Sequence, residues 1–295
     1  MPQNKEILSE ELQLKLEHLK QYIANLGSLA VGFSGGVDSS LLTAVAHEVL
    51  GDRLIAVTGA DASVPEREVN EAAAFCKERG IRHIICRVDP LKEEGYRHNS
   101  RDRCYFCKRG IFTEVRIIAE KNGIKHMAEG SNMDDIGDYR PGLRAAAELS
   151  VKSPLREAGL TKSEIRLISR AMGLPTWSKP AYACLASRFV YGEEITEEKL
   201  HMIDQAEQFI IEQGFFEERV RLHGQLARIE VPAGDIERLA SGKVREAVYK
   251  KLKEIGFMFV TIDMQGYRLG SMNATINKSE NTPGDTKLMK TIGET

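Results

Sequence analysis

The sequence predicts an α/β protein in which a parallel sheet carries helices on both faces and is followed by a smaller α+β domain. Three observations lead to this fold class. Short apolar segments alternate with segments of helical periodicity in the first half of the chain, a glycine-rich turn joins the first apolar segment to a helix, and the order of elements changes after Val190. Strands that alternate with helices are typical of βαβ units, which build parallel sheets.

The first predicted domain covers residues 1–190 and contains the βαβ units. Apolar runs predict its strands, and amphipathic periodicity predicts its helices. The expected strands are 29–33, 53–58, 81–88 and 126–129, and the expected helices are 8–26, 39–50, 65–79, 113–121 and 161–172. Pro65 suits the first turn of a helix, and Thr161 with Glu164 is a capping box. Residues 130–156, rich in Gly, Pro, Asp and Arg, are expected to form a functional loop with one short helix.

The second predicted domain covers residues 191–276. We expect a small α+β unit that serves substrate binding or oligomerisation. Its periodicity predicts a helix, two strands, a helical region in two pieces and a last strand. These elements are expected at 197–213, 219–222, 227–231, 235–255 and 257–262. Residues 277–295 are polar and contain few apolar side chains, so we expect a disordered tail.

The composition is ordinary for a soluble globular protein and argues against several functions. The 295 residues carry a formal net charge of −2, and the pI is about 6.4. Domains that bind nucleic acid usually carry a basic excess, so nucleic acid is disfavoured as a substrate. The N-terminal segment lacks the apolar core of a secretory signal, and no apolar run approaches the roughly 20 residues of a membrane span. We therefore expect a cytoplasmic protein without membrane contact.

The turn at residues 34–40, SGGVDSS, has the chemistry of a phosphate-binding loop. Glycines let backbone amides approach an anion, serine hydroxyls donate further hydrogen bonds, and the following helix adds its dipole. The loop is not a Walker A motif, because it has no lysine before the serine. It contains an acid instead, which is expected to hold Mg²⁺ beside the phosphates. The candidate residues are Ser34, Gly35, Gly36, Asp38, Ser39 and Ser40.

Three of the five cysteines, Cys104, Cys107 and Cys184, are candidates for chemistry. Cys104 and Cys107 form a C-x-x-C motif just before a predicted helix, but four-ligand zinc binding would need a second pair. Three thiolates are sufficient for three irons of a [4Fe–4S] cluster, whose fourth iron would stay open for a sulfide. Alternatively, the first two are ordinary residues of a helix start and Cys184 alone reacts. Cys76 and Cys86 lie in regular elements and are expected to be buried.

The string SGGVDSS resembles the signature of the PP-loop ATP-pyrophosphatases, which have an adenine nucleotide α-hydrolase-like sheet and adenylate their substrates with release of pyrophosphate. Four further motifs are very similar to those of the ATP-dependent sacrificial sulfur transferases. They are GSNMDD at 130–135, GDYRPGLR at 137–144, SPLREAGL at 153–160 and ACLASR at 183–188. The resemblance covers roughly residues 5–275, both predicted domains and not the tail.

This resemblance implies a role in assembly of the nickel-pincer nucleotide cofactor of lactate racemase. The implied substrate is pyridinium-3,5-biscarboxylic acid mononucleotide, of which ATP adenylates one ring carboxylate. The cysteine that matches Cys184 attacks the acyl-adenylate, and in single-cysteine members it then loses its sulfur and becomes dehydroalanine. Cys104 and Cys107 resemble the three-cysteine branch, which carries a [4Fe–4S] cluster and turns over. Whether sulfur transfer is sacrificial therefore stays open.

Several further residues are candidates for binding or catalysis. Arg188, four residues after Cys184, is expected to raise the thiolate character of that cysteine, although a solvent-facing arginine is an equal alternative. Arg140 and Arg144 suit bidentate binding of phosphate, and Gly130 of the GSNMDD motif is a further candidate for nucleotide binding. In the second domain the resemblance implies a substrate-phosphate and metal site at Arg221, Glu230 and Arg268.

Three other functions compete with sulfur transfer to a small nucleotide. A tRNA-thiolating PP-loop enzyme would combine the same loop and cysteines but should be basic. A non-catalytic ATP-binding sensor with a structural metal would bind ATP without releasing pyrophosphate. An amidotransferase-type synthetase would need a glutaminase or ammonia-supplying partner. The family resemblance further implies a homo-oligomer.

Overall fold

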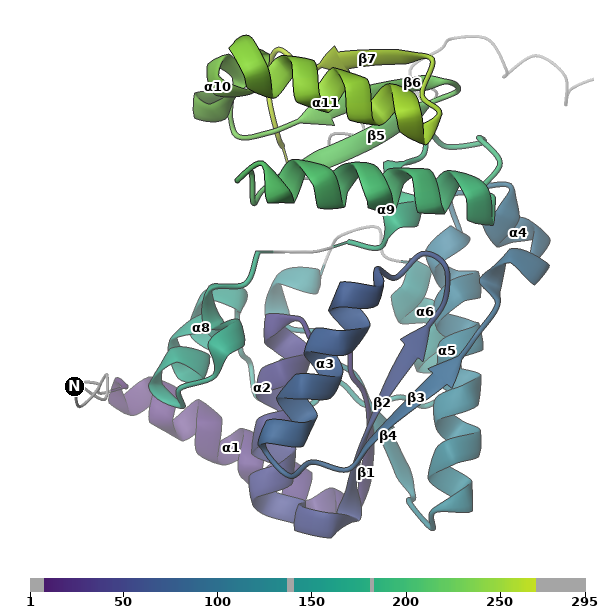
Figure 1. Ribbon diagram of the computed structural model, residues 1–295. Helices are drawn as coiled ribbons and strands as arrows, with labels where there is room; N and C mark the ends of the chain where they lie inside the picture. The colour runs from purple at the N-terminus through teal and green to yellow at the C-terminus, as the bar shows by residue number, and fades with distance from the viewer. Residues whose placement is uncertain (1–7, 137–140, 181–182, 269–295) are drawn as a thin grey trace, which may run out of the picture. The chain divides into compact units, whose positions relative to one another are not determined.

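The structure, a computed structural model, describes residues 8–136, 141–180 and 183–268, which form two compact units (Figure 1). The first unit contains the described residues up to Leu185 together with Glu194–Leu200. The second contains Ala186–Glu193 and the described residues from His201 onwards. The tail expected at 277–295 lies outside the described residues.

The first unit contains a sheet of four parallel strands in the order β3-β2-β1-β4, which confirms the predicted α/β class. The strands are β1 (Leu29–Gly32), β2 (Leu54–Ala60), β3 (His83–Arg87) and β4 (His126–Ala128). In a parallel sheet all carboxyl ends lie at one edge, and ligands of open α/β sheets bind there. That edge receives the loops that follow β1, β2 and β4.

Eight α-helices of the described chain belong wholly to this unit. They are α1 (Glu10–Leu26), α2 (Val37–Leu50), α3 (Glu66–Glu78), α4 (Glu94–Arg97), α5 (Arg103–Lys121), α6 (Pro141–Glu148), α7 (Pro154–Glu157) and α8 (Lys162–Ala171). The capping box of Thr161 and Glu164 is confirmed at the start of α8. The start expected for α5 at residue 113 is wrong, because the helix already begins at Arg103 and therefore contains Cys104 and Cys107.

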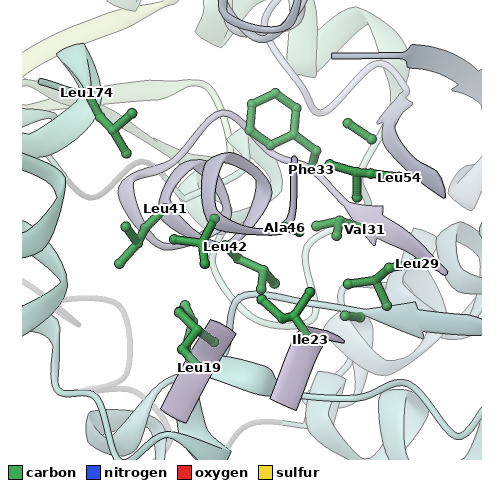
Figure 2. Close-up of a cluster of buried hydrophobic side chains, with 14 of the residues drawn as sticks. Leu19, Ile23, Leu29, Val31, Phe33, Leu41, Leu42, Ala46, Leu54 and Leu174 are labelled. Carbon is green, nitrogen blue, oxygen red and sulfur yellow. The ribbon is translucent and has the colours of Figure 1, made fainter. Parts of the chain in front are cut away.

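Both faces of the sheet are buried, and consecutive residues of one strand enter different cores. Leu29 and Val31 of β1 pack into a cluster with α1, α2, α3 and α8, whereas Ala30 packs into a second cluster with α5. β2 repeats the alternation. Figure 2 shows the first cluster, to which α1 contributes Leu19, α2 contributes Leu41 and Leu42, and β1 contributes Val31. The period of two along strands that are apolar throughout is the pattern of a fully covered parallel sheet.

The second unit has the order helix, two strands, two helices and strand that the sequence predicts. Its elements are the part of α9 (Glu197–Glu212) from His201 onwards, β5 (Arg219–His223), β6 (Leu226–Glu230), α10 (Ile236–Ala240), α11 (Gly242–Ile255) and β7 (Phe259–Ile262). β5 and β6 form an antiparallel hairpin, and β7 pairs parallel to β6. Within the described ranges, no helix combines the length and the apolar character that crossing a membrane requires.

Candidate active site

The phosphate loop connects β1 to α2, and its own serine side chains fix its shape. The Ser39 hydroxyl lies 3.1 Å from that of Ser34 and donates to the carbonyl of Gly36 at 3.2 Å. Gly35 has a φ of +69°, which glycine adopts without steric cost. Gly36 is the N-cap of α2, so the first amides of this helix have no intrahelical partner and remain available to an anion. The loop therefore fits a pyrophosphate group.

Asp38 lies in the first turn of α2, where it pairs with two residues from distant parts of the chain. The Lys162 ammonium group forms an ion pair with its carboxylate, and the Asn132 amide donates to the same carboxylate at 3.3 Å. Lys162 is the first residue of α8, and its backbone amide donates to Asp134 at 2.8 Å. The loop itself contains no lysine, but Lys162, from a distant part of the chain, places an ammonium group beside it.

Gly130 lies directly against this loop. A β-carbon on Gly130 would lie 2.9 Å from the Ser39 amide nitrogen, closer than real β-carbons approach. The preceding Glu129 is buried at the carboxyl end of β4 and accepts hydrogen bonds from Ser153 at 2.9 Å and from Lys108 at 3.3 Å. Burial alone would raise the pKa of Glu129, but Lys108 and neighbouring hydroxyls outweigh it and keep that pKa below its usual value. Glu129 is therefore a fixed anion beside the phosphate loop.

The C-x-x-C motif occupies the start of α5, where Cys104 is exposed and Cys107 is half-buried. Burial raises the pKa of Cys107, and the nearby Cys184, Asp61 and Cys104 raise it further. Cys104 and Cys184 therefore lie close enough to Cys107 to affect its pKa. The amide of Leu185 donates to the Ser63 carbonyl at 2.9 Å, which ties the Cys184 segment to the loop after β2. Cys76 and Cys86 are buried, as predicted.

We call Cys104, Cys107 and Cys184 the cysteine centre. The cysteine centre and the phosphate loop lie at the same edge of the sheet, where the carboxyl ends of its strands meet. Lys108, the residue after Cys107, pairs with Glu129, the residue before Gly130. The ion pair therefore connects the helix that carries two thiols to the turn that packs on the phosphate loop. A nucleotide bound at the loop and a sulfur atom bound at the cysteines would meet along this edge.

Cys104, Cys107 and Cys184 supply three thiols, and cysteine thiolates are the usual ligands of iron–sulfur clusters. Among the side chains that the structure describes, no three His, Cys, Asp or Glu residues converge as ligands of one ion. In a [4Fe–4S] cluster each cysteine would bind a different iron, so thiolates are donors of the right type for it. Mg²⁺ at Asp38 does not need a three-residue set, since it usually binds one or two carboxylates together with substrate phosphates. The donor chemistry is therefore compatible with both groups.

The second unit brings together the three residues predicted there. Arg221 donates to the Glu230 carboxylate at 2.9 and 3.1 Å. Arg228 lies 3.0 Å from the other Glu230 oxygen and also pairs with Asp263, which Arg268 approaches at 3.7 Å. Burial and the nearby Arg188 and Arg219 lower the pKa of Arg221, against the opposing effect of Glu230. Several arginines gathered in one unit favour an anionic ligand.

Arg188 belongs to the second unit and is buried, so the solvent-facing alternative is wrong. Its guanidinium forms two parallel hydrogen bonds with Glu207, at 2.8 and 2.9 Å, and a third with the Ser187 hydroxyl. Burial would raise the pKa of Glu207, but Arg188 outweighs it and lowers that pKa. The positive charge of Arg188 is thus largely matched by an adjacent carboxylate.

Of the two arginines predicted to bind phosphate, Arg144 lies within the described residues. Arg144 lies on α6, stacks on the Tyr105 ring at 4.2 Å and lies 3.4 Å from Asp102, all near the start of α5. It therefore contributes to the surroundings of Cys104 rather than to the nucleotide loop. Arg140 lies outside the described residues.

Sequence reasoning missed Lys162, Asn132 and the Lys108–Glu129 pair. A signal existed for Lys162, because a lysine at the first position of a helix opposes the helix dipole and is unfavourable without an anionic partner. Asn132 had a weaker signal, since asparagine after a strand is typical of turns and caps. The ion pair had none, because no periodicity connects α5 with the turn that follows β4.

Comparison with known sequences places this site in context. A profile described as NAD synthase matches residues 11–116. Over 270 residues the chain is 33% identical to a pyridinium-3,5-bisthiocarboxylic acid mononucleotide synthase of Lactiplantibacillus plantarum, covering 91% of this chain and 97% of the relative. The matched part contains the phosphate loop, the cysteines and most of the second unit.

Two further relatives extend over nearly the same length. An uncharacterized protein of Synechocystis is 39% identical over 267 residues, which is 90% of this chain and 100% of the relative. An uncharacterized protein of Methanocaldococcus jannaschii is 29% identical over 261 residues, which is 88% of this chain and 98% of the relative. The similarity therefore spans both units in each case.

Proposed function

The chain belongs to the family of pyridinium-3,5-bisthiocarboxylic acid mononucleotide synthases, and on this premise we propose that it transfers sulfur to a pyridinium dicarboxylate mononucleotide. It is an ATP-dependent sulfurtransferase that first adenylates a substrate carboxylate and then replaces AMP by sulfur. The observation that carries the proposal is that the phosphate loop and the cysteines lie at the same edge of the sheet. The Lys108–Glu129 ion pair connects the helix of Cys107 to the turn beside the phosphate loop.

The adenylation step uses the phosphate loop. Amides at the start of α2 and the hydroxyls of Ser34 and Ser39 bind the pyrophosphate part of ATP. Asp38 binds Mg²⁺, and Lys162 then moves from the Asp38 carboxylate to the phosphates. An oxygen of the substrate carboxylate forms a bond to the α-phosphorus, while the bond to the bridging oxygen breaks and pyrophosphate leaves. The result is an acyl-adenylate.

The sulfur step uses the cysteine centre. Adenylation makes the carboxyl carbon electrophilic because AMP is a far better leaving group than oxide. A carbon–sulfur bond forms and the bond to the AMP oxygen breaks. If Cys184 supplies the sulfur, a base removes the Cα proton of the thioester-bearing residue and the Cβ–S bond breaks with its electron pair on sulfur, so that the thiocarboxylate leaves and dehydroalanine remains. When bound by Cys104, Cys107 and Cys184, a [4Fe–4S] cluster would supply an open iron for an additional sulfide, and no cysteine would be consumed.

The second unit binds the phosphate of the substrate nucleotide in this proposal. Arg221, with Arg268 at the edge of the same network, supplies the positive charge, and Glu230 holds both Arg221 and Arg228 in place. Glu230 is also the residue that would ligate a metal beside the phosphate. We further propose a homo-oligomer that acts in the cytoplasm, where the free thiols of the chain stay reduced.

The test is a two-stage assay on protein purified without oxygen. The first stage measures pyrophosphate release from ATP with and without pyridinium-3,5-biscarboxylic acid mononucleotide, and the second identifies the thiocarboxylate by mass spectrometry. Release that depends on the substrate, followed by the thiolated product, is expected. Pyrophosphate release without any substrate dependence, or binding of ATP without release, would contradict the proposal.

Iron analysis separates the two sulfur routes. Iron, sulfide and the visible spectrum are measured for the wild type and for Cys104→Ser, Cys107→Ser and Cys184→Ser. About four irons per chain, lost in each variant, would support a cluster on all three cysteines. A folded wild type without iron, together with a mass loss of one H₂S at Cys184 after one turnover, would support the sacrificial route.

A further inference from the structure

Lys179 ties the chain just before Cys184 to helix α3. Its ammonium group lies 2.6 Å from a carboxylate oxygen of Glu68 and 2.7 Å from one of Glu71, and both acids belong to α3. The side chains of Lys179 and Glu68 are only 13% and 12% exposed, so this ion pair is largely shielded from solvent. Burial would lower the pKa of Lys179, but the two carboxylates outweigh it and raise that pKa, so the side chain stays charged.

The backbone on both sides of Cys184 is fixed as well. Arg166 of α8 donates to the carbonyl oxygen of Lys179 at 2.8 Å. On the other side of the cysteine, the amide of Leu185 donates to the carbonyl of Ser63 at 2.9 Å. Cys184 therefore belongs to a short stretch of chain that is attached to the first unit before and after it.

Helix α3 also packs directly on the phosphate loop. A β-carbon on Gly35 would lie 3.3 Å from the β-carbon of Ala72, the residue after Glu71. Phe75 of the same helix packs against Phe33, the residue before the loop, with ring centroids 5.4 Å apart. Ala72, Phe75 and Phe33 are buried, and close-packed interiors deform little, so α3 has a fixed position relative to the loop.

One helix thus contacts both the phosphate loop and the chain that leads to Cys184. We propose that Lys179 is a positioning residue for sulfur transfer, which holds the Cys184 segment at a fixed place relative to the phosphate loop through its ion pairs with α3. This inference rests on the proposed function. Lys179 touches neither reacting atom in this role and acts only through the helix.

The position of the sulfur decides between two fates of the acyl-adenylate. A correctly placed sulfur forms a bond to the carboxyl carbon, and AMP leaves with the electron pair of the broken C–O bond. With the sulfur displaced, water attacks the same carbon, AMP leaves, and the original carboxylic acid is regenerated. A displacement on the order of 1 Å can cost about 100-fold in rate, which is enough for hydrolysis to compete. Release of pyrophosphate precedes this step and does not depend on it.

The test compares Lys179→Met, which keeps a long side chain but removes the charge, with Lys179→Arg, which keeps the charge. Pyrophosphate and thiocarboxylate are measured in the same anaerobic reaction. Lys179→Met should release pyrophosphate at the wild-type rate but form at least about tenfold less thiocarboxylate per pyrophosphate. Lys179→Arg should restore most of this ratio. Lys20→Met is the matched control, because it removes an ion pair of equal length, with Glu48, that joins α1 to α2, and it should equal the wild type.

A second measurement needs neither ATP nor substrate. Hydrogen–deuterium exchange of the full chain, read out by mass spectrometry of peptides, reports local opening around Cys184. Exchange there should be at least about threefold faster in Lys179→Met than in the wild type, while peptides of β1 and α2 keep their exchange rates. Because nothing is turned over, this result stands even if the wild type forms no thiocarboxylate, which would contradict only the proposed function.

Either of two results would overturn the positioning role. One is exchange around Cys184 at the wild-type rate in Lys179→Met. The other is a wild-type ratio of thiocarboxylate to pyrophosphate in that variant, including the case in which both products fall together, because a general structural defect would lower both equally. If Lys179→Met does not fold, Glu68→Gln takes its place, since it removes one of the two anionic partners and keeps the shape of the side chain.

Discussion

Gly130 and Ser39 approach each other so closely that a single methyl group cannot be placed between them. A β-carbon on Gly130 would lie 2.9 Å from the Ser39 amide nitrogen and 3.2 Å from the Asp38 β-carbon. The atoms in the way are backbone atoms of the first turn of α2, which cannot rotate aside. The turn after β4 therefore fixes the position of the phosphate loop by direct backbone contact.

We expect Gly130→Ala to impair adenylation more than folding. The extra methyl group must displace the first turn of α2, and a displacement on the order of 1 Å can cost about 100-fold in rate. Pyrophosphate release should fall by about 10- to 100-fold, as measured with a coupled phosphate assay at several ATP concentrations.

Gly234→Ala is the control for this prediction, because a β-carbon there meets no atom within 4 Å. It should keep the wild-type rate of pyrophosphate release. A Gly130→Ala enzyme that is as active as the control would show that the loop tolerates the displacement, and the close contact would then have no role in ATP binding.

Lys162→Ala should weaken ATP binding. The ammonium group is the cation that the structure places against Asp38, and a hydrogen bond to a charged group contributes about 1.5–3 kcal/mol. Without the ammonium group, the charge of the Asp38 carboxylate is no longer neutralised and repels the phosphates. We expect a dissociation constant for ATP at least about tenfold higher by titration calorimetry, partly restored by excess Mg²⁺.

Lys20→Ala provides the comparison for Lys162→Ala, since Lys20 also pairs with an acid, Glu48, but lies in α1 away from the loop. Surface pairs of this kind contribute about 0–1 kcal/mol and should not affect ATP. Unchanged ATP affinity in Lys162→Ala would rule out a role of this lysine in binding phosphate.

The order of elements could be predicted because it depends on local periodicity. β1, β2 and the helices α2 and α8 lie within a few residues of their expected positions, and Thr161 caps α8 as predicted. The start of α5 could not be predicted in this way. Its first turns are stabilised by tertiary contacts, among them Phe106 against Gly95, where a β-carbon would lie 2.0 Å from the ring.

Only those parts of the candidate site that belong to sequence motifs could be predicted from the sequence. The string at residues 34–40 specifies a phosphate loop because glycine, serine and a helix start act locally. Lys162 reaches Asp38 across 124 positions of sequence, and Glu129 meets Lys108 across 21. Pairing over such separations depends on strand order and helix packing, which side-chain periodicity does not encode. The burial of Arg188 against Glu207 likewise arises from the packing of the second unit.

Arg188→Leu should strongly destabilise the second unit. Glu207 is fully buried, and without Arg188 it would keep the hydrogen bond from the Val220 amide but lose its ion pair, so a carboxylate without its paired cation would remain in the interior. Breaking a buried pair in this way costs about 3–5 kcal/mol. We expect a loss of this size in the free energy of unfolding, measured by urea denaturation at pH 7.

The double variant Arg188→Leu/Glu207→Leu should recover part of that loss, because it removes both charges. Lys250→Ala on α11, whose pairing with Glu254 at 3.9 Å is exposed, should change stability by less than about 1 kcal/mol. If the double variant is no more stable than the single one, packing of the arginine side chain rather than charge pairing is responsible.

Glu218 makes the stability of the second unit depend on pH. It is fully buried with both oxygens unpartnered among the described residues, and burial, with Glu207 adding to it, raises its pKa from 4.5 to about 8. The folded chain therefore retains a proton that the unfolded chain releases above pH 4.5. The contribution of Glu218 to the free energy of unfolding is fully present below pH 4.5 and is lost as the pH rises to about 8.

Glu218→Gln removes this dependence, because glutamine cannot ionise. Since one pKa unit corresponds to about 1.4 kcal/mol, the variant should gain more than about 1 kcal/mol relative to wild type at pH 8 and nothing at pH 4.5. Urea unfolding curves at half-unit pH steps measure the difference. Glu217→Gln is the matched control, because the neighbouring Glu217 is exposed and its substitution should change the free energy of unfolding by less than about 0.5 kcal/mol. A constant offset between Glu218→Gln and wild type across this range would mean that Glu218 is already ionised in the folded protein.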